Sequence, residues 1–508
     1  MEACSKKEYL CLELPTQDDS VSDQKRIQQA LNARGYAPVT FPLKVLRKLY
    51  PYCRDAGFDI TVTLVHREYD WVVTDVEAGD TRAHQYGLAV DYGSTTIVMQ
   101  LVDLGSGAVI GEEKEVNGQV AYGTDILTRI TYALEDPKHM QDLQQATAET
   151  FRILLDRLTD ATGIDAAGLP IMVVSGNTTM IHFLLGLDAW TVFAAPYAPV
   201  STDPGFLWGT ELGMAFEGLL YIIPSASNYV GGDIVSGLMK LELHKQEKTA
   251  MFFDVGTNGE LVIGNQDWMM AGAGAAGPAL EGYISKYGMR AAPGAIDTVR
   301  IEGRNLTFTT IDGQRPVGIC GSGIIDLLAQ MRIHGWIDIA GTLDPNASDR
   351  IQFLPEEKEY AAVYATAEDS ANGKPLYFSQ TDILQYLDTK AAAYTMVECL
   401  LETVGMDAGE LSRVYLSGAF PAHSDLESAI TIGIFPDLPR QNYTVLKNSS
   451  LDGARTVLLD YSRLAEAKAL AEQIYCVQFA SVPDFLIRMQ AAKFIPHTDL
   501  KRFPSVQI

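Results

Sequence analysis

The chain has 508 residues, 47% of them hydrophobic and 20% charged, a composition typical of a globular protein with about two to four domains. Its 39 Lys and Arg residues against 64 Asp and Glu residues give a net charge of -25, which argues against nonspecific binding to nucleic acid or to an anionic membrane. The N-terminus has no signal-peptide pattern and the chain has no apolar run of about 18 residues, so we expect no membrane span and a cytoplasmic location.

The first 84 residues predict a short extension (1–20) and then a linker with a small α+β domain (21–84). Residues 22–34, SDQKRIQQALNAR, predict a helix with Ser22 as its N-cap, and residues 42–56 predict a second helix with Pro42 in its first turn. The segments FDITVTLV and YDWVVTDVEAG alternate between apolar and polar residues with period two, as strands do.

From Tyr86 the pattern changes to that of a mixed α/β protein. A strand, a turn and a strand (86–102) precede a long helical stretch from about 126 to 158, and LPIMVVSG predicts another strand. A similar strand–turn–strand starts again at Met251. We therefore expect a two-lobed domain over 85–508, with lobe one at about 85–245 and lobe two at about 246–508.

Two polar turns carry the chemistry of this domain. Each begins with a carboxylate at the end of an apolar strand, Asp91 or Asp254. The residues that follow are Gly93, Ser94, Thr95 and Thr96 in the first turn and Gly256, Thr257, Asn258 and Gly259 in the second. Backbone N–H groups in Gly-containing turns, together with hydroxyls, bind phosphates. A carboxylate would repel phosphate, so we expect Asp91 and Asp254 to hold Mg²⁺ through water or to orient an attacking water.

A nucleoside needs a flat surface of small residues, and two segments offer one. In VYLSGAF, Gly418 and Ala419 follow a strand, and in CGSGIIDLL, Gly321 and Ser322 open a predicted helix. The alternative for both segments is a strand-to-helix turn in which glycine serves packing alone.

These pieces, in this order, resemble the ASKHA fold of actin, Hsp70 and sugar kinases, with duplicated RNase H-like subdomains. Phosphate-binding segments fall at 91–96 and 254–259, and an adenosine-binding segment at 416–420. The strings YGLAVDYGSTT, SGNTTMIHFLLGLD, FDVGTNGELVIG, GICGSGIIDLL, YLSGAF and SSLDGARTVLLD resemble the RACE proteins, the reductive activators of corrinoid enzymes. The resemblance covers the chain from about residue 15 to its end.

The resemblance implies an ATPase that uses ATP and Mg²⁺ to return the cobalamin of a corrinoid methyltransferase protein from Co(II) to Co(I), and it implies a homodimer. Typical members also carry an iron–sulfur domain, but the six cysteines lack the C-x₄-C-x₂-C spacing of plant-type ferredoxins. We therefore expect no cluster here. Either a separate electron donor serves the protein or it handles the corrinoid protein without reducing it. The competing functions are a small-molecule kinase and a non-catalytic, nucleotide-dependent interaction protein.

Other polar residues have a structural and a functional interpretation. Asn177, Thr178 and Thr179 could line the nucleotide cleft or cap the helix that follows. His182 is interpreted as a core residue rather than a ligand, and Asp233 as a helix cap rather than a Mg²⁺ or water ligand. His423 and Asp425 are interpreted as loop contacts. Cys320, in GICGSG, has no companion cysteine for a cluster shared by two chains.

Overall fold

A computed structural model describes the chain except for residues 1, 257–258, 275–279, 281, 283, 419–420, 422, 480–481 and 508. The chain divides into two compact units. The first consists of Met1–Glu242 and Ser449–Ile474, and the second of Leu243–Asn448 and Tyr475–Ile508. A simple division of the chain near residue 245 would place residues 449–474 in the second lobe, but they belong to the first unit.

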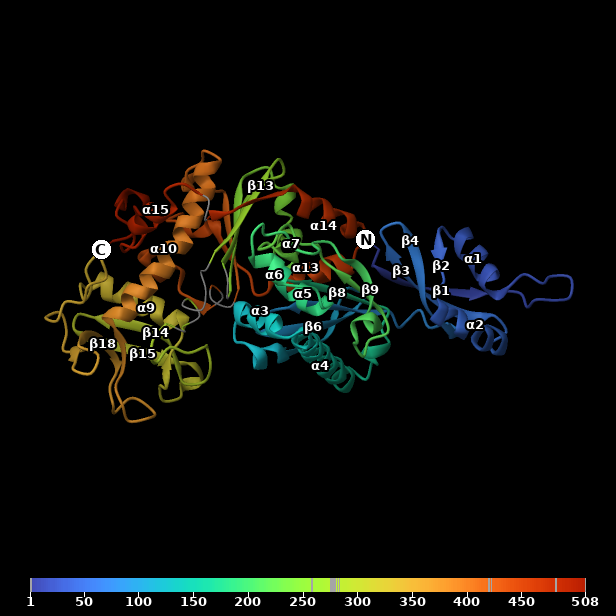
Figure 1. Ribbon diagram of the computed structural model, residues 1–508, viewed down its shortest axis with the longest axis horizontal. Helices are drawn as coiled ribbons and strands as arrows, with labels where there is room; N and C mark the ends of the chain where they lie inside the picture. The colour runs from blue at the N-terminus through green and yellow to red at the C-terminus, as the bar shows by residue number, and fades with distance from the viewer. Residues whose placement is uncertain are drawn as a thin grey trace. The chain divides into compact units, whose positions relative to one another are not determined.

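The N-terminal part of the first unit is a four-stranded sheet with two helices packed against it (Figure 1). Its sheet order is β1-β3-β4-β2, and β1 pairs antiparallel with β3 along its whole length. The first helix begins after its predicted N-cap, Ser22, whose side chain accepts a hydrogen bond from the Lys25 N–H. Pro42, predicted in the first turn of the second helix, is the N-cap residue of that helix. These elements are β1 (Ser5–Cys11), α1 (Asp23–Ala33), β2 (Val39–Thr40), α2 (Leu43–Asp55), β3 (Asp59–Arg67) and β4 (Asp70–Ala78).

The rest of the first unit is built on a six-stranded sheet of order β7-β6-β5-β8-β10-β9. Three strands form an antiparallel meander, β5 (Tyr86–Tyr92), β6 (Thr96–Asp103) and β7 (Val109–Val116), while β8 (Ile171–Gly176) and β10 (Leu219–Ile222) run parallel to β5. The edge strand is β9 (Gly205–Trp208), antiparallel to β10. The helices are α5 (Thr178–Leu185), α6 (Trp190–Phe193), α7 (Gly232–Leu241), α13 (Ser449–Leu458) and α14 (Ser462–Gln473).

The helical stretch predicted from about 126 to 158 is two helices, α3 (Ile126–Glu135) and α4 (Pro137–Thr162). Asp136 separates them in an extended conformation and caps α4 by accepting a hydrogen bond from the Lys138 N–H. The residue before a proline is disfavoured in the helical region, and proline is favoured at the first position of a helix. The predicted helical stretch is therefore confirmed, with an interruption at Asp136 that was not predicted.

The second unit contains a sheet that repeats five strands of the first, with its sixth strand at the opposite edge. Its order is β21-β20-β11-β12-β13-β22, with an antiparallel meander of β11 (Ala250–Val255), β12 (Gly259–Gly264) and β13 (Met269–Gly274). Two strands lie parallel on the other side of β11, β20 (Arg413–Ser417) and β21 (Tyr443–Val445), and β22 (Ile474–Val477) borders β13. The repeated plan is the duplicated α/β subdomain of the predicted ASKHA fold.

Two small sheets and four further helices complete the described part of the second unit. The sheets have the orders β15-β14-β16 and β17-β18-β19. The elements are β14 (Ala295–Glu302), β15 (Asn305–Thr310), β16 (Gly318–Ile319), α9 (Gly321–Ile333), β17 (Ile351–Leu354), β18 (Glu359–Ala365), β19 (Leu376–Ser379), α10 (Gln380–Thr403), α12 (Leu426–Ile432) and α15 (Phe485–Ala492).

Candidate functional site

Asp91 lies at the penultimate position of β5, between the buried residues Val90 and Tyr92. It is paired in register with Val98 of β6 and with Ser175 of β8, and it is only partly buried. The next residue, Tyr92, points into the core, where its hydroxyl lies 2.9 Å from Thr147 Oγ1, and burial raises its pKa. The hydrogen bond of Tyr92 therefore holds the end of the strand against the core, and the Asp91 carboxylate lies at the edge of the core.

The turn of residues 93–96 is held closed by a buried asparagine. Asn117 donates from Nδ2 to the Gly93 carbonyl at 3.0 Å and from its backbone N–H to the Thr95 carbonyl at 2.9 Å. A Cβ on Gly93 would lie 2.5 Å from the Thr96 carbonyl oxygen, so the turn closes this tightly only with glycine there. All four residues of the turn remain partly exposed, which suits a phosphate-binding loop.

A chain of buried serine hydroxyls ends on Asp91, and sequence analysis did not single it out. Ser450 of α13 donates to Asp91 Oδ1 at 2.8 Å. Ser175 Oγ lies 2.9 Å from Ser450 Oγ and accepts from Ser236 of α7 at 2.7 Å. Ser450 is separated from Asp91 by 359 residues, so no local pattern could connect them. Its string, SSLDGARTVLLD, entered the sequence analysis only as part of the family resemblance.

Asp254 occupies in β11 the place that Asp91 has in β5. It is the penultimate residue of the strand and pairs in register with Glu260 of β12 and Ser417 of β20. Gly256, directly after the strand, is partly buried, and Gly259 is buried in β12. Thr257 and Asn258 lie outside the described residues. The two strand ends thus share a carboxylate paired with a serine on the parallel neighbour strand.

Gly418 follows β20 in a conformation that only glycine adopts readily, with φ at +102°. A Cβ there would lie 2.2 Å from the Val255 carbonyl oxygen, so the backbone after β20 passes directly against the end of β11. Ala419, its predicted companion in nucleoside binding, lies outside the described residues. The adenosine surface stays a prediction, but the need for glycine at 418 now has a definite steric cause.

Gly321 and Ser322 open α9, as the sequence predicted, with Cys320 as the N-cap residue. The Cys320 thiol is buried and donates to the Ile296 carbonyl at 3.3 Å. A Cβ on Gly323 would lie 2.4 Å from the same oxygen, so this glycine serves the packing of α9 on β14. For Gly323 the packing interpretation therefore holds, and Gly321 and Ser322 remain predicted nucleotide contacts.

Several alternatives left open by the sequence have structural answers. Asn177 is the N-cap of α5 and accepts from the Thr179 N–H at 3.0 Å. His182 is fully buried, with Nδ1 2.7 Å from the Thr178 carbonyl oxygen and Nε2 accepting from the Val200 N–H, and burial lowers its pKa. Asp233 is not the N-cap of α7, which is Gly231; it lies in the first turn and accepts from the Ile234 N–H at 2.9 Å.

Of the two remaining loop residues, His423 is exposed, and Asp425 is the N-cap of α12. Among the described residues, no three or more His, Cys, Asp or Glu side chains gather so as to hold a metal ion directly.

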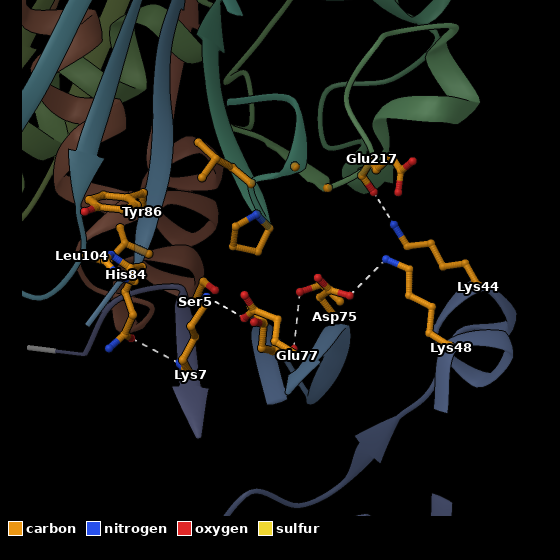
Figure 2. Close-up of a pocket in the computed structure, with 17 residues that line it drawn as sticks. Ser5, Lys7, Lys44, Lys48, Asp75, Glu77, His84, Tyr86, Leu104 and Glu217 are labelled. Atoms are coloured by element: carbon orange, nitrogen blue, oxygen red, sulfur yellow. Dashed lines mark hydrogen bonds and ion pairs between the residues drawn. The ribbon is translucent and has the colours of Figure 1, made fainter. Parts of the chain in front are cut away.

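A polar cavity of about 160 Å³ lies elsewhere in the first unit, among the four-stranded sheet, α2 and the loop before β10. Figure 2 shows Lys44 and Lys48 of α2 reaching the Glu217 backbone carbonyl and the Asp75 carboxylate. Lys7 of β1 lies 2.6 Å from Glu77. The three lysines that line the cavity are balanced by three carboxylates, Asp75, Glu77 and Glu217, so the cavity lacks the surplus positive charge of an anion site. None of the predicted nucleotide residues lines it.

Comparisons with known proteins place the chain among corrinoid activators. The RACo linker region matches residues 1–83, the RACo middle region 86–246, and the C-terminal ASKHA domain of RACo 248–507. The solved structure of a reductive activator for a corrinoid iron–sulfur protein superposes with a TM-score of 0.88 at 35% identity, covering 99% of this chain and 81% of that one.

Two curated relatives agree with these matches. The corrinoid activation enzyme RamQ of Eubacterium limosum is 29% identical over 471 residues, 88% of this chain and 79% of RamQ. The reductase of a methylated amine-specific Co(II) corrinoid protein from Methanosarcina barkeri is 24% identical over 423 residues, 77% of this chain and 73% of that protein. No helix in the described part of the chain is both long and apolar enough to cross a membrane.

Proposed function

Because the chain belongs to the RACo family, we propose that it is an ATPase that reactivates a corrinoid methyltransferase protein by assisting the reduction of Co(II) cobalamin to Co(I). The observation that carries this proposal is the repeated strand end, in which an aspartate follows an apolar strand and precedes a Gly-containing turn in each unit. The names of the relatives supply the partner, a corrinoid protein, and the reductive activation of that partner.

The residues present suit a magnesium nucleotide. The partly exposed hydroxyls of Ser94, Thr95 and Thr96, with the N–H groups of their turn, would bind phosphate oxygens. Asp91 and Asp254 would hold water molecules of Mg²⁺ and orient the attacking water. The backbone at Gly418 would lie against the nucleoside. Bound Mg²⁺ would neutralise charge that develops on the phosphate oxygens.

The source of the electron divides the proposal in two. One version of the proposal has a separate low-potential electron donor, because the six cysteines lack the spacing of a plant-type ferredoxin. The alternative is a handling factor that uses ATP to change the state of the corrinoid protein without reducing it. In either case nucleotide binding favours a partner conformation that is otherwise rarely populated. We include a homodimer in the proposal.

The experiment that tests the proposal follows the cobalamin spectrum. A Co(II) corrinoid protein, Mg-ATP, a low-potential reductant and the purified chain are mixed anaerobically. Co(I) that appears only with ATP supports an activator with an external donor. An ATP-dependent change in the Co(II) spectrum without Co(I) supports a handling factor. If ATP turnover is absent with and without the partner, the enzyme proposal is wrong.

A matched pair of variants makes this experiment specific. Asp91→Asn should abolish ATP turnover, whereas Asp160→Asn, which changes an exposed carboxylate on α4 of the same unit, should leave it unchanged. The competing kinase function predicts ATP consumption that depends on a small hydroxylated acceptor rather than on the corrinoid protein.

A further inference from the structure

Three serine hydroxyls and the Asp91 carboxylate form a continuous hydrogen-bonded chain inside the first unit. The chain runs from Ser236 through Ser175 and Ser450 to Asp91, with oxygen–oxygen distances of 2.7, 2.9 and 2.8 Å. Ser236 and Ser175 are fully buried, and Ser450 is 6% exposed. Buried hydroxyls that bond one another in this way strengthen each other and keep fixed positions.

The chemistry of the last member sets the direction of the whole chain. An ionised carboxylate only accepts, so Ser450 donates its one proton to Asp91. The Ser450 oxygen is then an acceptor for Ser175, and the Ser175 oxygen accepts from Ser236. Ser175 also lies 3.1 Å from the Gly232 carbonyl, a second acceptor for its proton. Ser236 therefore orients Ser175, whose one proton is shared between the Ser450 oxygen and the Gly232 carbonyl, and the Ser450 hydroxyl points at the carboxylate.

The helix that carries Ser450 is held in place by close backbone packing. A Cβ on Gly453, one turn after Ser450, would lie only 2.0 Å from the Ser236 carbonyl oxygen. The backbones of α13 and α7 are thus in direct contact where the hydroxyl chain crosses between them. The position of Ser450 relative to Asp91 is therefore determined by helix packing as well as by its hydrogen bonds.

We propose that Ser450 is a positioning residue for Asp91: it fixes the orientation of the carboxylate, while Ser175 and Ser236 hold the Ser450 hydroxyl in place. A hydrogen bond to an ionised group is short and strong, so its loss leaves the carboxylate free to rotate. The effect on catalysis rests on the proposed ATPase function, whereas the effect on the orientation of Asp91 does not.

The kinetic test compares Ser450→Ala with Ser450→Thr. Loss of one hydrogen bond to a charged group should lower kcat for ATP hydrolysis roughly tenfold, with KM for ATP within about twofold. Ser450→Thr, which keeps the hydroxyl, should recover most of the loss. Ser462→Ala is the control, because Ser462 also donates to an aspartate, Asp460, at 2.7 Å but lies outside the hydroxyl chain.

A second measurement is independent of activity. Crystal structures of the wild type and of Ser450→Ala, both without nucleotide, compare the orientation of the Asp91 carboxylate. In Ser450→Ala the carboxylate should leave its wild-type orientation or occupy more than one. Wild-type kcat together with an unchanged Asp91 orientation in Ser450→Ala would overturn the proposal, as would equal losses in the Ala and Thr variants. If the wild type lacks ATPase activity, the proposed function fails, and the crystal structures alone decide the role of Ser450.

Discussion

Lys390 offers a sharp test of how the C-terminal segment is held. It is fully buried on α10, and its ammonium contacts the carbonyl oxygens of Ala492, Phe494 and Pro496 at 2.5, 2.8 and 2.5 Å. Burial lowers the pKa of Lys390 to about 7, and Glu398 opposes this. The three carbonyls act in the same direction as Glu398, because only the ammonium form has three N–H bonds to donate.

Replacing Lys390 with Met should free this segment without leaving a large cavity. Each lost bond from a charged donor is worth about 1.5–3 kcal/mol. The variant no longer buries a charge, which offsets several kcal/mol of that loss. We expect local opening of residues 491–499 to become easier by about 3 kcal/mol, so that amide hydrogen exchange there speeds up roughly 100-fold. Mass spectrometry of the C-terminal peptides measures this rate directly.

The control for this prediction is Lys493→Met, on the same segment. Lys493 pairs with Asp388 at the surface and is 33% exposed, and such pairs contribute less than about 1 kcal/mol. Its exchange rates should stay within about fivefold of the wild type. If Lys390→Met also stays within that range, the three carbonyl contacts do not hold the segment, and the reasoning from hydrogen-bond geometry is refuted.

Three further predictions concern pH, the glycine after β20 and the second carboxylate. Burial and the charges of Lys390 and Arg502 lower the pKa of His497 to about 4, so the folded state binds fewer protons than the unfolded state between pH 6.5 and 4. Thermal unfolding should therefore show that about 3 kcal/mol of stability is lost as the pH falls through this window. His497→Gln should make the stability less dependent on pH there. Gly418→Ala forces a Cβ against a strand carbonyl at positive φ, so nucleotide affinity, measured by calorimetry, should fall at least tenfold, and unchanged affinity would remove Gly418 from the proposed site. Asp254→Asn should reduce ATP turnover at least 100-fold in a phosphate-release assay with the fold retained, and normal turnover would exclude a catalytic role for this carboxylate.

The fold was predictable because its signals are local and repeated. Apolar runs ending in Asp91 or Asp254 produce the same strand end twice, and both strands lie at the same place in the five-strand arrangement that the two sheets share. Helix caps such as Ser22 are also local signals, because the cap and its hydrogen-bond partner lie within a few residues of each other in the sequence. The break between α3 and α4 has a local signal too, the proline at 137, and it was missed because apolar periodicity continues across it.

The parts that escaped prediction depend on contacts between distant segments. The strand β1 has a polar, weakly alternating sequence, SKKEYLC, and forms because β3 pairs with it along its full length. Ser450 meets Asp91 only because residues 449–474 return to the first unit. The role of Asn117 in closing the turn of residues 93–96 likewise requires knowledge of where the chain goes after β7.

The return of residues 449–474 has a consequence for how the protein is made. The Cys4 thiol donates to the Val457 carbonyl, 453 residues away, and the Tyr461 N–H donates to the Glu2 carbonyl at 2.8 Å. At about 5–20 residues per second, a ribosome needs on the order of 20–90 seconds to synthesise that interval. During this time the surface of β5 and β8 that later receives α13 is without its helix. In a nascent chain the Asp91 turn is therefore synthesised long before Ser450. Folding of the first unit can finish only near the end of translation.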